Sequence, residues 1–342
     1  MQRRQQCASA VFMVRSAAFG FNVETAASNA FQAQGGALGG ALLGGPVAQV
    51  AQVAEVIRVN SLARAESAGL QQALESEGIR VIALDDSTQP SKPDAVFPNN
   101  WVSFHHDGTL VLYPMLAPIR RLERRAELVE ALCARLNFRA RRQIDLTAHE
   151  RAGRYLEGTG SLVLDHVGRI AYACRSPRTD ESLVREWARL MDYEPIVFDA
   201  TDAFARPYYH TNVVMWIGTR CAMIGSTALA PADRQRVCAK LRDSGRELFE
   251  VDRDMIAAFA GNMLELASWD EALGDCSVLV MSVTAQRALA GPVWQRLSGC
   301  VDTILTVPVP TIERIGGGSV RCMLAEVPEI VWEPAKVPDT RS

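Results

Sequence analysis

The feature of this 342-residue chain that most restricts its fold is an internal repeat. Five times, small or amide-bearing residues lead directly into an apolar stretch that is typical of a β-strand, and successive copies lie about 50 to 60 residues apart. Regular spacing of this kind indicates one structural unit used five times. The repeated stretches are Pro98–Phe104, Gly158–Leu164, His210–Trp216, Gly261–Leu266 and Gly317–Leu324.

Helical patterns fill the intervals between the copies, so each unit combines a few short strands with a helix. Five such ββαβ-type units predict an α/β fold closed into a ring, because a ring leaves no exposed sheet edge. The glycine- and amide-led strand ends would then meet around one axis. The clearest predicted helices are Arg121–Leu136, Glu181–Met191, Pro231–Ser244 and Ala285–Leu297, with two more over Val47–Asn60 and Ser61–Gly78 and a first buried strand over Ala10–Val14.

The remaining sequence predicts a single domain over residues 1–342. A glycine-rich stretch, residues 35–46, is a candidate loop, and a tail begins at about residue 330. Whether this loop covers a site or is a mere insertion stays open.

Composition excludes several classes of partner. The net charge is −3 with both signs mixed, which argues against nucleic acid. No segment holds the roughly 18 uninterrupted apolar residues that a membrane span needs. The eight cysteines form no CxxC pair and no zinc-site spacing, which favours a reducing, cytoplasmic location and no metal.

Four corners of the repeat carry reactive or polar side chains. Cys322 follows a glycine run that lets the backbone approach a ligand, and Glu157 precedes a glycine turn. His210 and Asn212 lie two positions apart, so on a strand they would face the same side, whereas Arg321 would face away from Cys322. Asn100 stands between aromatic residues.

Each of these residues alone also fits a structural role, such as a buried strand cysteine. Together they place a thiol, a proton shuttle, a carboxylate and amides where a central site would form, which suits thiol-based acyl or amidino transfer. The other four histidines lie in polar stretches and are predicted at the surface: His105, His106, His149 and His166.

The pattern resembles the guanidine-modifying superfamily of arginine deiminases, dimethylarginine hydrolases and amidinotransferases. It is most similar to the citrulline-utilisation hydrolases, or citrulline ureidases. The resemblance implies the five-bladed pseudo-symmetric α/β-propeller known as the pentein fold. The shared stretches run in order along almost the whole chain: FGFNVETAASNAFQ (19–32), DAVFPNNWVSFH (94–105), LEGTGSLVLD (156–165), SPRT (176–179), HTNVVM (210–215), FAGNMLEL (259–266) and GGGSVRCM (316–323).

The resemblance implies a role for each matching residue. Cys322 matches the nucleophile, His210 the general acid/base and Glu157 the acid that opens a Glu-Gly-Gly-Asp motif. Arg178, in the short Ser-Pro-Arg-Thr stretch, matches an arginine that holds the substrate carboxylate. A covalent thiol intermediate needs no metal or organic cofactor.

Two departures from the deiminase pattern bear on the substrate. Asn100 and Asn212 stand where deiminases carry aspartates, and Gly160 stands where their motif ends in an acid. A guanidinium offers five N–H donors and no acceptor, so asparagines suit it poorly. A neutral ureido group offers both a carbonyl and N–H groups, which an amide complements.

We therefore expect hydrolysis of L-citrulline to ornithine, carbon dioxide and ammonia, with Asn100, Asn212 and Arg178 binding the small-molecule substrate. One alternative is an arginine deiminase, a dimethylarginine-type hydrolase or an amidinotransferase, for which Asp94 or Asp202 would supply the missing charge. The other is a non-catalytic propeller that serves as a binding module. The oligomeric state, including a homo-oligomer, stays open.

Overall fold

A computed structural model of the chain describes residues 6–32, 46–136, 140–270 and 274–328, with the backbone alone over 46–51. Most of the predicted glycine-rich loop and the predicted tail fall outside these ranges. Among the described residues, no helix is long and apolar enough to cross a membrane. In the same ranges, no cluster of three histidine, cysteine, aspartate or glutamate side chains is placed to hold a metal ion.

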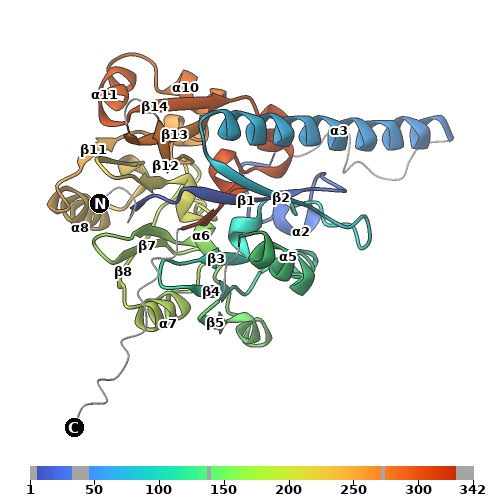
Figure 1. Ribbon diagram of the computed structural model, residues 1–342, viewed down its shortest axis with the longest axis horizontal. Helices are drawn as coiled ribbons and strands as arrows, with labels where there is room; N and C mark the ends of the chain where they lie inside the picture. The colour runs from blue at the N-terminus through green and yellow to red at the C-terminus, as the bar shows by residue number, and fades with distance from the viewer. Residues whose placement is uncertain (1–5, 33–45, 137–139, 271–273, 329–342) are drawn as a thin grey trace, which may run out of the picture.

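Five three-stranded sheets surround a common centre, which confirms the predicted five-bladed α/β-propeller (Figure 1). In each sheet the middle strand pairs antiparallel with one neighbour and parallel with the other. The sheets, with the middle strand second, are β15 (Ala325–Val327), β1 (Ala10–Arg15) and β2 (Arg80–Asp85); β3 (Val102–Phe104), β4 (Thr109–Leu112) and β5 (Arg142–Asp145); β6 (Val163–Asp165), β7 (Ile170–Cys174) and β8 (Glu194–Phe198); β9 (Met215–Ile217), β10 (Cys221–Ile224) and β11 (Glu247–Glu250); and β12 (Leu264–Asp270), β13 (Gly274–Ser282) and β14 (Thr303–Val307).

Each parallel pair is joined by a helical crossover, as parallel strands require. These crossovers give every blade the predicted ββαβ order. They are α2 (Val23–Ala26) with α3 (Pro46–Ser76), α4 (Pro118–Arg121) with α5 (Ala126–Leu136), α7 (Glu181–Met191), α8 (Pro231–Asp243), and α10 (Val283–Ala288) with α11 (Pro292–Cys300).

Three helix predictions were wrong in detail. The helix expected over Arg121–Leu136 begins only at Ala126, because α4 ends at Arg121 and the chain turns between them. The two helices expected over residues 47–78 form one helix, α3, which extends beyond the body of the protein (Figure 1). The helix expected over Ala285–Leu297 is broken into α10 and α11, because Gly291 adopts a positive φ of 79° and Pro292 starts the next helix.

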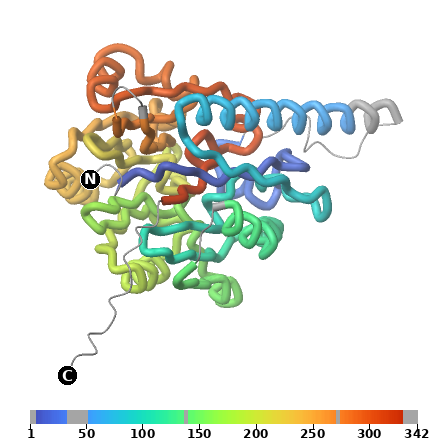
Figure 2. The backbone as a smooth tube through the Cα atoms, in the orientation of Figure 1, coloured from blue at the N-terminus to red at the C-terminus, as the bar shows by residue number. Residues whose placement is uncertain are grey.

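The two ends of the described chain close the ring. Strand β15 near the C-terminus pairs with β1 near the N-terminus, with Phe12 opposite Ala325, and Figure 2 shows the two segments side by side. Both faces of strand β1 are buried, so its alternate residues pack into two separate hydrophobic clusters.

The corners of the repeat are helical turns and not the strand starts that the sequence predicted. Short turns bring the chain to the axis before each first strand begins. The i, i+2 argument for His210 and Asn212 was therefore wrong, since Thr211–Val213 is a 3-10 turn. The corner turns are η1 (Pro98–Asn100), α6 (Gly158–Ser161), η3 (Thr211–Val213), the turn before Asn262, and η6 (Val320–Met323); η2 (Thr147–Ala152), η4 (Ser226–Ala228), α9 (Arg253–Ala257) and the π-helical turn η5 (Ile312–Gly316) complete the fold.

Candidate active site

Cys322 lies in the turn η6 and is buried. Its Sγ accepts hydrogen bonds from Nδ2 of Asn262 at 3.2 Å and from Nδ2 of Asn212 at 3.7 Å. Gly318 allows this packing, because a Cβ there would lie 3.0 Å from the Phe97 ring. Burial nevertheless raises the pKa of the Cys322 thiol above its ordinary value, against the amide donors. The resting sulfur is therefore a neutral thiol held by two amides.

Asn262 was given no role from the sequence, although it lies at the fourth corner of the repeat. Its Nδ2 also donates to the Asn212 carbonyl oxygen at 2.9 Å, and its Oδ1 accepts from the Arg321 backbone N–H at 3.0 Å. These contacts hold its amide against the thiol from both sides. The signal that could have revealed it is its equivalence to Asn100, Glu157 and Asn212 in the repeat.

Glu157 and His210 form a buried pair, with 2.9 Å between Glu157 Oε2 and His210 Nε2. Each residue immediately precedes a corner turn, α6 or η3. The other carboxylate oxygen, Oε1, accepts the Leu116 backbone N–H at 3.0 Å. Both oxygens of Glu157 are thus occupied, which fits a partner of His210 better than a direct ligand of substrate.

The two pKa values of this pair define its resting state. Burial alone would raise the pKa of Glu157, but the Arg178 guanidinium, His210 and Arg120 together lower it to about 2. Burial lowers the pKa of His210 to about 4, against the attraction of Glu157. Because an ionised carboxylate only accepts, Nε2 of the neutral imidazole carries the proton and Nδ1 is left as an acceptor.

Asn100 is oriented by a buried arginine, Arg120, that the sequence analysis did not single out. Arg120 Nη1 donates to Asn100 Oδ1 at 2.8 Å, and its Nε and Nη2 each reach a Glu123 oxygen at 2.9 Å. An arginine only donates, so the amide oxygen of Asn100 must face it. Nδ2 of Asn100 therefore donates to Asn99 Oδ1 at 3.0 Å, and its second N–H is left for another acceptor.

Arg178 is buried beside Glu157, with 3.6 Å between its Nη1 and Glu157 Oε2. Its Nε and Nη2 donate to Ser28 Oγ at 3.0 and 2.8 Å, and Nη2 also reaches the Thr25 carbonyl. Through these hydrogen bonds the Arg178 guanidinium holds the segment that contains α2 next to the site. Binding of a substrate carboxylate stays a prediction, and it requires exchange of these partners.

Of the two acids considered as extra charge, only Asp94 lies at the site. Its Oδ2 accepts from Asn22 Nδ2 at 2.7 Å and lies 3.8 Å from Arg120 Nε, whereas its buried Oδ1 has no hydrogen-bond partner. Asp202 instead pairs with Arg206 at 2.7 Å away from this pocket. Asp94 therefore brings a carboxylate with one buried, unpartnered oxygen to the wall of this pocket.

These side chains enclose a small central pocket, here called the reaction pocket. Its free volume is about 10 Å³, which is about the space of one water molecule. Asn212 and Glu157 are not on its surface: Asn212 lies behind Cys322, and Glu157 lies behind His210. The reaction pocket is lined by Asn29, Asp94, Phe97, Asn100, Arg120, Arg178, Tyr209, His210, Gly316, Gly318 and Cys322.

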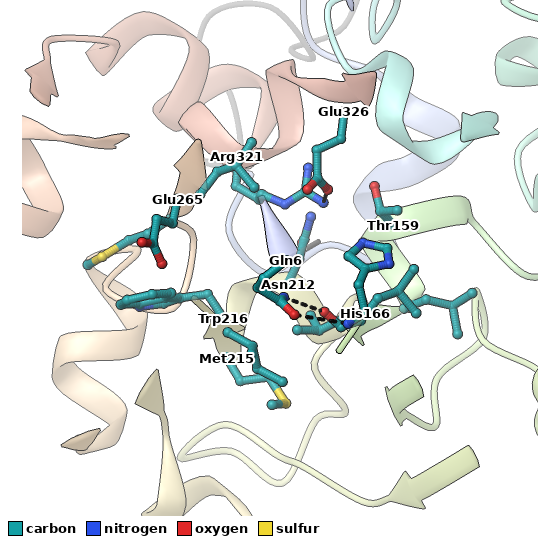
Figure 3. Close-up of a pocket in the computed structure, with 15 residues that line it drawn as sticks. Gln6, Thr159, His166, Asn212, Met215, Trp216, Glu265, Arg321 and Glu326 are labelled. Carbon is teal, nitrogen blue, oxygen red and sulfur yellow. Dashed lines mark hydrogen bonds and ion pairs between the residues drawn. The ribbon is translucent and has the colours of Figure 1, made fainter. Parts of the chain in front are cut away.

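A second small cavity is lined by Asn212, Arg321 and Glu326, among other residues (Figure 3). Arg321 lines this cavity and Cys322 lines the reaction pocket, so the two side chains are separated as predicted, although they lie in a 3-10 turn and not in the predicted strand. Its guanidinium donates to the Leu324 carbonyl at 2.8 Å and to Glu326 at 2.7 Å. Arg321 therefore fixes the turn that carries Cys322 and does not enter the reaction pocket.

The prediction that His105 is a surface group was wrong. His105 is buried, its Nε2 lies 2.8 Å from Ser103 Oγ, and burial lowers its pKa to about 3. The residues next to His105 in sequence are polar, so they did not indicate that the Trp187 ring would pack 5.9 Å from its ring.

We expect acid to destabilise the fold through its buried neutral histidines. His210 and His105 take up protons near pH 6.5 when unfolded but only near pH 4 and pH 3 when folded. The unfolded state thus binds more protons, and the free energy of unfolding should fall by roughly 3 kcal/mol per histidine between pH 6.5 and 4. Glu157, whose pKa is lowered, adds a loss below about pH 4.5.

Urea unfolding at pH 7 and pH 4.5 would measure this loss, with His105→Asn as the comparison. The variant should show a smaller decrease than the natural chain. An unfolding free energy that is unchanged or larger at pH 4.5 would contradict the neutral, buried state of these imidazoles.

Comparison with known proteins assigns this arrangement to a class and a family. Residues 15–329 match the family described as "N,N dimethylarginine dimethylhydrolase, eukaryotic". The five blades and the family match define a pentein hydrolase of the guanidine-modifying class. Within that class, the chain belongs to the N,N-dimethylarginine dimethylhydrolase family. No curated protein shows a significant match.

Solved structures of low sequence identity share the fold. The substrate-bound N-terminal domain of ArgZ, an arginine dihydrolase from cyanobacteria, has a TM-score of 0.66 at 14% identity, over 94% of this chain and 99% of that one. Unliganded AgrE has a TM-score of 0.67 at 16% identity, over 95% of this chain and 40% of AgrE. A dimethylarginine dimethylaminohydrolase adduct with S-methyl-L-thiocitrulline has a TM-score of 0.58 at 13% identity, over 94% of this chain and 100% of that one.

Proposed function

We propose that this protein hydrolyses the ureido group of L-citrulline, and that the described residues form one catalytic domain. The observation that carries the substrate assignment is the orientation of Asn100. Because Arg120 holds its oxygen, Asn100, which lines the reaction pocket, can offer a substrate only an N–H donor. A ureido oxygen can accept from that donor, whereas a guanidinium has no acceptor to offer.

Asp94 complements the other half of a ureido group. Its unpartnered Oδ1 is an acceptor for the ureido N–H groups. One donor and one acceptor in the same lining match a group that carries both a carbonyl and N–H bonds. Leaving either unmatched would cost the full desolvation of a buried polar group.

Proton transfer from Cys322 to His210 would begin the reaction. In the resting state the thiol is protonated and the imidazole is neutral, so His210 can take the thiol proton. The thiolate then accepts the Asn262 and Asn212 N–H groups, and the ionised Glu157 stabilises the imidazolium. Burial that disfavours the isolated thiolate is thus offset when the ion pair forms.

The covalent step follows from this ion pair. Cys322 Sγ bonds to the ureido carbon, the C–N bond to the side-chain nitrogen breaks, and the His210 proton passes to that nitrogen, which releases ornithine. His210 then takes a proton from water, whose oxygen attacks the S-carbamoyl carbon. The C–S bond breaks, the thiol regains its proton, and carbamic acid decomposes to carbon dioxide and ammonia.

A second candidate is hydrolysis of a guanidino compound such as a methylated arginine. It is favoured by the full negative charge of Asp94, which suits a cation, and by the description of the matched family. The two candidates share Cys322 and His210 and differ in the group that Asn100 and Asp94 bind.

Replacing Asn100 tests the substrate assignment. Asn100→Asp removes the N–H donor, so we expect kcat/KM for citrulline, measured by ornithine release, to fall by about 10- to 100-fold. Asn99→Asp is the neighbouring control and should have a smaller effect, since Arg120 does not orient it. An Asn100→Asp protein with undiminished citrulline hydrolysis would rule out the ureido–amide contact.

Gly160 offers an independent test of the site geometry. A Cβ at this position would lie 2.5 Å from Asn100 Nδ2 and 2.7 Å from His210 Nδ1, so Gly160→Ala must displace both groups. We expect activity to fall by at least about 10-fold. The control Gly69→Ala, in α3 with nothing within 4 Å of the added Cβ, should keep full activity. Full activity in Gly160→Ala would show that His210 and Asn100 need not stand where they do.

A further inference from the structure

A much larger cavity adjoins the reaction pocket. This outer cavity has a volume of about 640 Å³, within the range of pockets that bind drug-sized ligands. The reaction pocket has room for about one water molecule, so the two differ greatly in capacity. The outer cavity therefore has space for a ligand body that the reaction pocket cannot hold.

One layer of side chains separates the two cavities. Tyr209 lines both, and its hydroxyl donates to the Gly317 carbonyl of the glycine-rich turn. Asn29 lines the reaction pocket, while the next two residues, Ala30 and Phe31, line the outer cavity. The Phe31 ring lies 5.9 Å from that of Tyr209. A substrate that reached Cys322 past this wall would extend into the outer cavity.

Five aromatic side chains line the outer cavity: Phe31, Phe204, Tyr208, Tyr209 and Phe259. Phe31 packs 5.0 Å from Phe259 and 6.0 Å from Tyr208, and Phe204 exposes 79% of its surface beside them. A large exposed aromatic side chain next to an apolar cavity is typical of a binding site. These rings favour a flat or apolar group in the cavity.

Charged side chains of both signs line the cavity, namely the arginines Arg206, Arg253 and Arg314 and the acids Asp202, Asp254 and Glu313. Asp202 and Arg206 neutralise each other at 2.7 Å. Glu313 is engaged by Thr284 and Ser319 hydroxyls at 2.6 and 2.7 Å. Arg314 presents an exposed guanidinium on the same cavity. A substrate carboxylate beside the apolar group can pair locally with Arg314.

We propose that the outer cavity binds an apolar acyl group on the α-nitrogen of the substrate, so that the preferred substrates are Nα-acylated ureido amino acids. The inference rests on the proposed function, which places the ureido end at Cys322 and the α-carbon at the wall. The α-carboxylate meets the arginine side of the cavity, and the acyl group meets its aromatic side.

Three substrates test this inference: L-citrulline, Nα-acetyl-L-citrulline and Nα-benzoyl-L-citrulline, with carbamate-derived ammonia as the common readout. We expect kcat/KM for the benzoyl compound to exceed that for L-citrulline by at least about 10-fold, with the acetyl compound between them. Phe204→Ala should lower the benzoyl value about 5-fold and leave L-citrulline nearly unchanged. Trp269→Ala, which removes an exposed aromatic side chain away from both cavities, is the matched control.

The outcomes separate this inference from the proposed function. Equal or better use of free L-citrulline, or an equal loss for all substrates in Phe204→Ala, would overturn the acyl site while leaving the hydrolase intact. Absence of ammonia from all three substrates would overturn the proposed function itself, and with it the acyl site.

Discussion

Replacement of Cys322 by serine should reduce citrulline turnover by more than about 1,000-fold while leaving the fold intact. The sulfur occupies the one position that contacts both Asn212 and Asn262 at the edge of the reaction pocket. A serine hydroxyl at that place is far less acidic than a thiol, so proton transfer to His210 would produce the attacking anion much less often. Ornithine release would measure the loss, and far-ultraviolet circular dichroism would check the fold.

Cys133 provides the matched control for this replacement. It lies partly buried on α5, outside the reaction pocket, and Cys133→Ser should retain full turnover. A Cys322→Ser protein that hydrolysed citrulline at the rate of the natural chain would eliminate the covalent mechanism.

Removal of the Arg120 side chain should produce the largest loss of stability among the site residues. Arg120 is buried among Glu123, Asp94 and Glu157, and its Nε and Nη atoms lie 2.9 to 3.8 Å from their oxygens. Arg120→Met would leave these acids without their shared cation, and removing one partner of a buried ion pair costs about 3–5 kcal/mol. Urea unfolding at neutral pH would measure the decrease.

A second replacement separates charge from packing in this cluster. The double variant Arg120→Met/Glu123→Met removes one acid together with the cation, so it should recover part of the lost stability. Arg121→Met, whose side chain is 29% exposed, should cost much less. An Arg120→Met protein as stable as the natural chain would show that the cluster is not held by Arg120.

The blade architecture was predictable because each blade has its own local sequence pattern, and this pattern occurs five times. Each copy places an apolar strand after small residues, and helix α7 was predicted with its observed bounds because Asp180 caps its first turn and one face is apolar. The corner turns were not predictable as turns. Apolar residues such as Val213 and Val214 favour strands, yet they are buried near the axis in and just after a 3-10 turn.

The candidate site was predictable in its residue types but not in its supporting contacts. Cys322, Glu157, His210 and Asn212 occupy repeat corners, and the ring brings them together. Arg120 was hidden, because it lies in a run of charged residues that is typical of a solvated helix. Only the tertiary fold turns its guanidinium inwards to Asn100 and Glu123.

Asp94 shows the same limit for the substrate. From the sequence it was one of two acids of unknown position, and only the fold places Asp94 in the lining of the reaction pocket and Asp202 outside it. Charge and hydrogen-bonding state inside a pocket depend on residues from several blades. They therefore cannot be obtained from any one copy of the repeat.

The most direct test of the central claim is a paired incubation of the purified protein with L-citrulline and, separately, with L-arginine and Nω,Nω-dimethyl-L-arginine, followed by separation of the amino-acid products. The orientation of Asn100 predicts ornithine from citrulline and no product from either guanidino compound. Citrulline formed from arginine or dimethylarginine would keep Cys322 and His210 as the reacting pair but would contradict the assignment of a ureido substrate.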